Sequence, residues 1–170
     1  MCGIFGYLGH QQALPILVEG LRRLEYRGYD SIGVAVDDGE TIQTHKTVGK
    51  VSDLKSILPA SIDGTLGIAH TRWATHGGVT QANAHPHASE NGTVHLVHNG
   101  IIENFQQLRK SLSKRGVECK SETDSEVLAH MMALELEKGA EPLDAVLSTL
   151  RRLRGTWGLC IMFKELDMLV

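Results

Sequence analysis

Cys2 is the residue with the clearest chemical potential, because it directly follows the initiator Met1. Cysteine has a small side chain, so removal of Met1 would leave a thiol and a free α-amino group on one residue. An α-amine titrates near ~7.7–8, so part of it is unprotonated at neutral pH and can act as a base. A nucleophile with its own base is suited to acyl transfer. Position 2 alone does not establish this chemistry, since any small residue can follow Met1.

A second polar group follows an apolar run, in the segment His70-Thr71-Arg72-Trp73-Ala74-Thr75-His76-Gly77-Gly78. Glycine pairs allow hinge-like backbone motion, and the guanidinium of Arg72 can hold a carboxylate through two hydrogen bonds. The alternative is a solvated arginine beside a structural tryptophan.

The segment His98-Asn99-Gly100 offers a third group. We expect Asn99 to end a strand. A side-chain amide together with a backbone N–H can stabilise an oxyanion, and one such donor contributes about 2.7–4 kcal/mol to the transition state. Asn-Gly is also a common turn, and without Cys2 that interpretation would be preferred.

The segment Ser121-Glu122-Thr123-Asp124-Ser125-Glu126 is the fourth. Thr123 or Asp124 could simply cap a helix. A carboxylate at this place could instead bind the ammonium group of a substrate.

Composition narrows the classes of function. The chain has 170 residues, 42% of them hydrophobic and 22% charged, and its net charge is −3, which gives no basic surface for nucleic acid. There is no apolar run of membrane-spanning length and no signal-peptide pattern. Three widely spaced cysteines favour the reducing cytoplasm over a disulfide scaffold. Among nine histidines, His85-Pro86-His87 lacks a zinc-site spacing, so we expect no metal. No pattern for a phosphate- or dinucleotide-binding loop is present, and we expect no cofactor.

The periodicity of apolar residues predicts one domain over residues 1–170. A long functional loop is expected at residues 72–89, since structureless loops of this length are otherwise uncommon. The order of the elements indicates an α+β fold of antiparallel sheets packed against helices. Strands are predicted at residues 4–8, 31–36, 41–48, 66–71, 93–98, 157–164 and 166–170, and helices at residues 11–25, 103–114, from 124 onward and from 142 onward.

Five segments, in order along the chain, resemble one family. They are residues 2–7 (Cys-Gly-Ile-Phe-Gly-Tyr), 25–31 (Glu-Tyr-Arg-Gly-Tyr-Asp-Ser), 70–77 (His-Thr-Arg-Trp-Ala-Thr-His-Gly), 98–104 (His-Asn-Gly-Ile-Ile-Glu-Asn) and 121–124 (Ser-Glu-Thr-Asp). Together they are similar to the glutaminase domains of glucosamine-6-phosphate synthases, and more broadly to the class II glutamine amidotransferases. The resemblance implies a four-layer αββα sandwich, the N-terminal nucleophile hydrolase fold.

The resemblance also implies a reaction, the hydrolysis of L-glutamine to glutamate and ammonia. Cys2, after loss of Met1, would attack the carboxamide carbon, with its α-amine as general base. Asn99 and the N–H of Gly100 would hold the oxyanion.

The remaining implied roles concern the substrate. Arg72 would bind its α-carboxylate and Asp124 its α-ammonium. The resemblance further implies that Thr75 and His76 line the glutamine pocket, that Arg27 and Gly28 position the amino terminus, and that Trp73 guards the exit of ammonia.

Proteins of this family continue past residue 170 into two sugar-isomerase domains, which use the ammonia to convert fructose-6-phosphate to glucosamine-6-phosphate. We therefore expect the last part of the glutaminase domain and both partner domains to be absent from this chain. Two alternatives stay open. One is the glutaminase domain of another class II enzyme, such as an amidophosphoribosyltransferase. The other is a catalytically silent module that binds glutamine.

Overall fold

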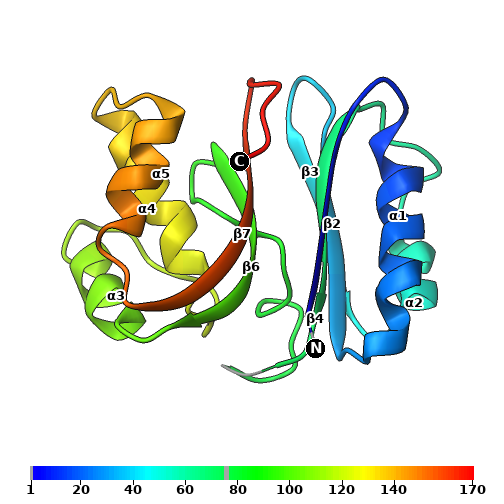
Figure 1. Cartoon of the computed structure of the whole chain (residues 1–170), viewed down its shortest axis with the longest axis horizontal. Coiled ribbons are helices and arrows are strands. Elements are labelled where there is room, and N and C mark those ends of the chain that lie inside the picture. The colour runs from blue at the N-terminus through cyan, green and yellow to red at the C-terminus, as the bar shows by residue number, and fades with distance from the viewer. Residues whose placement is uncertain (1, 75–76) are drawn as a thin grey trace.

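The fold consists of four layers, two sheets face to face with helices on both outer sides (Figure 1). The computed structural model describes residues 2–74 and 77–170. Both sheets are antiparallel throughout the described residues. The predicted α+β fold with an αββα sandwich is confirmed.

The first sheet has four strands in the order β1-β4-β2-β3. The two middle strands are almost wholly buried, because one face packs on helices and the other on the second sheet. Strands β2 and β3, both predicted from the sequence, pair as an antiparallel hairpin. The strands are β1 (Gly3–Leu8), β2 (Ser31–Asp37), β3 (Ile42–Val48) and β4 (Leu66–Arg72).

Two helices cover the outer face of this sheet, α1 (Ala13–Leu24) and α2 (Val51–Ile57), and a short 3-10 helix, η1 (Glu25–Arg27), follows α1. The apolar face of α1 supplies Leu17 and Leu21, both fully buried against the sheet. Helix α2 is seven residues long and was not predicted from the sequence.

The second sheet has the order β5-β6-β7, formed by β5 (His87–Ala88), β6 (Val94–Ile102) and β7 (Gly155–Phe163). The prediction that Asn99 ends a strand is wrong. Strand β6 continues to Ile102, because β7 pairs with all nine of its residues. The expected loop at residues 72–89 also contains the short strand β5, so it is not wholly without regular structure.

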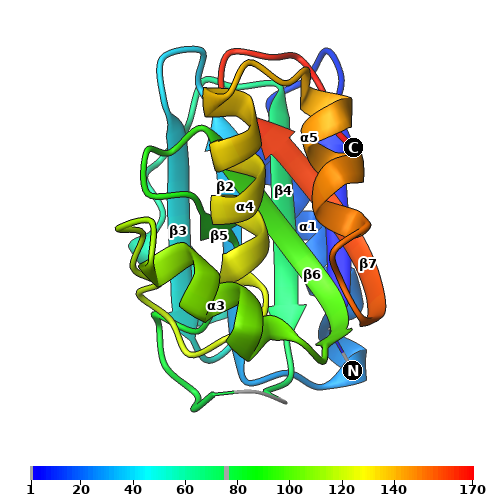
Figure 2. The ribbon, with the colours of Figure 1, turned by 90° about the vertical axis from the view of Figure 1, so that its left-hand side faces the viewer.

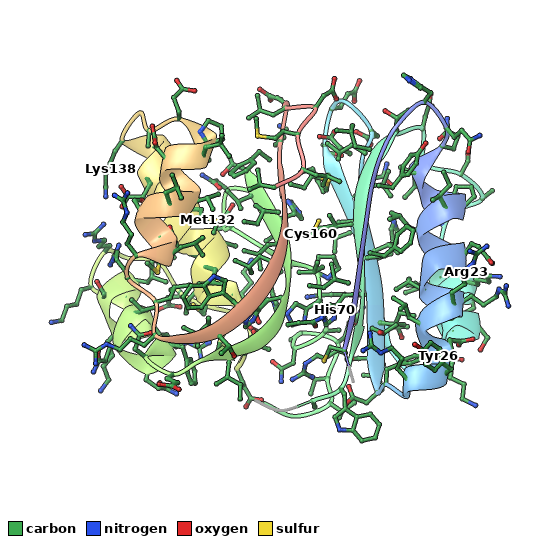
Figure 3. The ribbon with its side chains drawn as sticks, viewed as in Figure 1. Arg23, Tyr26, His70, Met132, Lys138 and Cys160 are labelled. Carbon is green, nitrogen blue, oxygen red and sulfur yellow. The ribbon has the colours of Figure 1, made fainter. Side chains whose placement is uncertain are left out.

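Helices α3 (Phe105–Ser113), α4 (Glu126–Glu137) and α5 (Pro142–Leu150) cover the outer face of the second sheet. Helix α4 is buried on most sides in its first two turns, since it lies between the sheet and its neighbouring helices. Its Met132, fully buried, points into this layer (Figure 3). No helix in the described part of the chain is both long and apolar enough to cross a membrane.

A small apolar cluster joins the two sheets, and the strands of one sheet run obliquely across those of the other (Figure 2). The predicted strand at residues 166–170 is limited to an isolated bridge between Met162 and Leu169. The buried members of this inter-sheet cluster are Ala35, Leu66, Ile68, Val97 and Met162.

Candidate functional site

A pocket of about 570 Å³ opens at the end of the sandwich where β1 begins and β4 ends. Both sheets and the segment before α4 contribute to its wall. Its lining residues are Cys2, Arg27, His70, Arg72, Trp73, His85, His98, Asn99, Gly100, Ile101, Thr123, Asp124, Ser125 and Thr156.

Strand pairing places Cys2 beside the end of β4. Gly3 pairs with Thr71, so the residue before Gly3 lies next to the residue after Thr71. The half-buried Cys2 thiol accepts a hydrogen bond from the backbone N–H of Trp73, with 3.2 Å between sulfur and nitrogen. The sulfur is therefore held at the start of the loop that follows β4, facing the pocket.

Arg72 is the last residue of β4 and is only 4% exposed, although its side chain reaches the pocket. Its Nη1 donates to the carbonyl of Gly78 at 3.2 Å. Asp30 fixes the backbone on either side: its N–H donates to the carbonyl of Arg72 at 2.8 Å, and its Oδ2 accepts from the N–H of Ala74 at 2.5 Å. A buried guanidinium on a fixed strand end can bind a carboxylate with little reorganisation.

Gly100 has a φ of 137°, a conformation that side chains rarely adopt. A Cβ at this position would lie 2.1 Å from the carbonyl oxygen of Thr156 on β7. Only glycine therefore allows β6 and β7 to approach here. Asn99, one residue earlier, lines the pocket, and its Oδ1 lies 2.9 Å from Nε2 of His70.

Asp124 is 5% exposed and lines the pocket from the segment before α4. Its Oδ2 accepts a hydrogen bond from the N–H of Ile102 at 2.8 Å, and its Oδ1 accepts from Ser125 at 3.3 Å. Asp124 does not act as the N-cap of α4, whose N-cap is Ser125. The carboxylate can thus face a substrate ammonium while its second oxygen stays bonded to the backbone.

Glu126 organises the backbone before Asp124. It accepts hydrogen bonds from the N–H groups of Lys120 and Ser121 and from the ring of His130. Burial raises the pKa of Glu126, but the hydrogen bonds from His130 and Ser121 outweigh it and lower the pKa to about 2.

Glu122 ties the loop after β4 to the segment that carries Asp124. Its Oε2 accepts from the N–H of Gly78 at 3.1 Å and from Nδ2 of Asn83 at 2.9 Å. Asn83 in turn accepts from the N–H of Glu122 at 2.8 Å. Because Gly78 also receives the hydrogen bond of Arg72, this network links the positions of the loop and the guanidinium.

Arg27, the last residue of η1, lines the pocket, and Gly28 directly follows it. The positive φ of Gly28, 70°, brings its backbone beside the ring of Trp73, 3.5 Å from where a Cβ would lie. The Trp73 side chain is 54% exposed and borders the pocket opening.

Three buried histidines line the pocket floor, and two of them are neutral at ordinary pH. Burial is the main cause that lowers the pKa of His70, to about 4, and that of His85 well below its usual value. Within residues 2–74 and 77–170, no three His, Cys, Asp or Glu side chains are arranged to hold a metal ion.

The pocket brings together seven of the residues selected from the sequence, and Gly28 lies beside them. Thr75 and His76 fall outside the described residues. Sequence reasoning assigned no role to His70, Asp30 or Glu122, although each lies in or next to a selected segment. The seven are Cys2, Arg27, Arg72, Trp73, Asn99, Gly100 and Asp124.

Comparison with known proteins identifies the family. The family model described as "Glutamine amidotransferase domain" matches residues 70–170. The chain belongs to the glutamine amidotransferase domain family. The matched region contains Arg72, Asn99, Gly100 and Asp124.

Curated relatives of this amidotransferase domain carry the name glutamine--fructose-6-phosphate aminotransferase [isomerizing]. The protein from Mesorhizobium japonicum is 49% identical over 100% of this chain and 28% of its own length. Those from Idiomarina loihiensis and Thermus thermophilus are 51% and 46% identical, over 95% and 100% of this chain. The chain therefore spans about 28% of the length of the relatives it matches.

Solved structures share the fold of this amidotransferase domain. The glutamine phosphoribosylpyrophosphate amidotransferase of B. subtilis superposes with a TM-score of 0.81 and 29% identity, over 96% of this chain and 35% of its own. A structure described as the allosteric regulatory enzyme of purine biosynthesis gives a TM-score of 0.82 and 30% identity, over 96% of this chain and 36% of that one.

Proposed function

We propose that this chain hydrolyses L-glutamine to glutamate and ammonia, with Cys2 as the nucleophile after removal of Met1. The observation that carries the proposal is the convergence of Cys2, Asn99, Arg72 and Asp124 on one pocket of about 570 Å³. Glutamine carries opposite charges on its α-carbon, and the pocket offers one buried cation and one buried anion. These two charges match the α-carboxylate and the α-ammonium of glutamine.

In the proposed reaction the Cys2 sulfur attacks the carboxamide carbon, and the thiol proton passes to the α-amine. The Asn99 amide and the N–H of Gly100 hold the oxyanion of the tetrahedral intermediate. The α-amine then protonates the leaving nitrogen, so the C–N bond breaks and ammonia departs past Trp73. Water, deprotonated by the same amine, cleaves the thioester to give glutamate and returns the proton to sulfur.

The substrate would be oriented by its α-carbon groups, with the carboxylate on Arg72 and the ammonium on Asp124. Arg27 and Gly28 would support the new amino terminus of Cys2. The family resemblance also assigns Thr75 and His76 to the binding of glutamine, and the proposal includes that assignment.

In the complete protein, the ammonia would be used by sugar-isomerase domains to convert fructose-6-phosphate to glucosamine-6-phosphate. The name shared by relatives that are 46–51% identical supports this acceptor. The alternative is that this chain is the glutaminase domain of an amidophosphoribosyltransferase. The phosphoribosylpyrophosphate amidotransferase structure supports it less strongly, because its identity is only 29%. A reducing compartment such as the cytoplasm suits the proposed chemistry, because oxidation would inactivate the thiol.

The proposal is tested by mass spectrometry and by turnover. The intact protein should lack Met1 and gain one adduct on Cys2 with a diazoketone analogue of glutamine. The other two thiols should not react, since burial raises the pKa of Cys119 and Cys160.

For turnover, Cys2→Ala should abolish ammonia release while Cys119→Ala, outside the pocket, retains it. Normal hydrolysis by Cys2→Ala would refute the proposal. Calorimetry showing glutamine binding without turnover in the unmodified chain would support the silent binding module instead.

A further inference from the structure

His70 and Asn99 face each other across the space between the sheets. His70 is on β4 of the first sheet and Asn99 on β6 of the second, and the His70 ring lies between them (Figure 3). Nε2 of His70 is 2.9 Å from Oδ1 of Asn99, and the His70 side chain is fully buried. The amide that borders the pocket is therefore held from the opposite sheet.

The direction of this hydrogen bond decides what Asn99 presents to a substrate. An asparagine amide has a donor end, Nδ2, and an acceptor end, Oδ1. Only the donor end stabilises an oxyanion, and the acceptor end would repel it. Because Oδ1 of Asn99 is bonded to His70, Nδ2 is the end left for the pocket.

The protonation state of His70 controls that direction. Burial lowers the pKa of His70 to about 4, although hydrogen bonds to the Asn99 side chain and to the His98 backbone oppose this effect. The ring is thus neutral near pH 7 and has one N–H. If the proton is on Nε2, the ring donates to Oδ1 of Asn99. If it were on Nδ1, Nε2 would accept from Nδ2 and turn Oδ1 toward the pocket.

The surroundings favour the proton on Nε2. Nδ1 of His70 is buried and makes no hydrogen bond to any described residue, so a proton there would be an unsatisfied buried donor. The His85 ring packs against His70, with centroids 4.3 Å apart and planes 32° apart, and it restricts rotation of the His70 ring. The charge of Arg72 further disfavours a second proton.

We propose that His70 is a positioning residue which, protonated on Nε2, holds the Asn99 amide with its nitrogen toward the oxyanion. This inference rests on the proposed glutamine hydrolysis. According to it, the tautomer of one buried histidine determines which end of the Asn99 amide faces the pocket. His70 itself does not touch the reacting atoms.

The tautomer can be measured without turnover, by a long-range ¹H–¹⁵N correlation spectrum of histidine-labelled protein near pH 7. We expect Nε2 of His70 to show a protonated-nitrogen shift and Nδ1 an unprotonated one. The reverse pattern, or two protonated nitrogens, would overturn the proposal. This result stands apart from the proposed function, which fails only if the wild-type chain does not hydrolyse glutamine.

Two variants test the effect on catalysis. Loss of an oxyanion donor lowers kcat by about 10²–10³, and we expect His70→Leu, which misorients the donor, to lower kcat by about 10–100-fold with KM within about threefold. His70→Gln carries an N–H at similar reach and should retain most of the wild-type kcat. The matched control is His95→Leu, a buried histidine on β6 away from the pocket, which should keep kcat unchanged.

An unchanged kcat in His70→Leu, a change in KM alone, or equal losses in His70→Leu and His70→Gln would each refute the positioning role. If His70→Leu does not fold, the spectrum and the His70→Gln kinetics still decide the question.

Discussion

Asp124 is bonded to the backbone of the strand that carries Asn99 and Gly100, through its Oδ2 and the N–H of Ile102, which are 2.8 Å apart. The proposed ammonium-binding carboxylate and the proposed oxyanion donors thus share one rigid support. A glutamine held at its α-carbon by Asp124 would have its carboxamide placed relative to β6.

Asp124→Asn should remove the negative charge of the side chain while keeping its hydrogen bond to the backbone. The amide oxygen can still accept from Ile102, so the thermal unfolding midpoint should change little. We expect kcat/KM for glutamine to fall by at least about 30-fold, because removing one partner of a buried charge pair costs about 2–5 kcal/mol. Steady-state kinetics with glutamine and with glutaramate, which lacks the α-amine, provide the check. A similar loss for both substrates would contradict pairing with the ammonium.

Gly100→Ala should damage both stability and activity. The new Cβ would meet the carbonyl of Thr156 at 2.1 Å, in a residue whose φ is 137°. Backbone strain and overpacking together predict a loss of about 2–5 kcal/mol in the free energy of unfolding, measurable by urea denaturation. Gly116→Ala is the matched control, since Gly116 also has a positive φ, 82°, but nothing lies within 4 Å of its Cβ position. Equal losses in the two variants would exclude the steric explanation.

Stability should decline in mild acid, before the carboxylates titrate. Burial lowers the pKa of His70 and of His95 to about 4, from a usual 6.5. Between these values the unfolded chain binds more protons than the folded one. The free energy of unfolding therefore falls as the pH drops from 6.5 toward 4, and neither group affects it well above 6.5.

Each of these histidines should contribute about 3 kcal/mol to that loss by pH 4. Urea unfolding measured between about pH 7.5 and about pH 4.5 tests the slope. His95→Leu should flatten it. The pKa of Glu126 is lowered from 4.5, so its effect begins only at more acidic pH. If the free energy of unfolding of the wild-type chain stayed constant between about pH 7.5 and about pH 4.5, these histidines would not be held buried in their neutral form.

Glu122→Ala should loosen the loop after β4, because it removes the acceptor for Gly78 and Asn83. We expect KM for glutamine to rise by about 3–30-fold, the equivalent of one or two hydrogen bonds at about 1 kcal/mol each, with a smaller effect on kcat. Glu118→Ala removes the same charge from a nearby position and serves as the control. A higher KM in both variants would point to net charge instead.

Most of the longer strands were predictable, because the pattern of apolar residues within each of them already indicates burial. The run Leu66–Arg72 is buried at every position and reads as one apolar strand, and the Asp-Gly turn before β3 marks its hairpin. Helix α2, only seven residues long, is too short for periodicity to identify it. Asn99 was misplaced at a strand end, because the pairing with β7 that extends β6 is a tertiary contact that local sequence does not contain.

The residues around the candidate site likewise divide into those that the sequence identifies and those that only tertiary contacts reveal. Cys2, Arg72, Asn99 and Asp124 could be selected by type and by family resemblance. The partners that orient them are far away in sequence: His70 is 29 residues from Asn99, and Glu122 is 44 residues from Gly78. A buried histidine in an apolar strand resembles a filler of the core until the opposite sheet is in view.

The apolar cluster between the sheets, which includes Ile68, Val97 and Met162, separates the two sheets that carry the proposed catalytic residues. Cys2 and Arg72 belong to one half of the sandwich, and Asn99 and Gly100 to the other. The gap that a substrate must bridge is therefore set by the thickness of an apolar layer that contains none of these four residues. Substitutions that preserve the volume of this cluster should leave glutamine hydrolysis unchanged. A change of one methylene group should alter the rate, although all four of these residues stay the same.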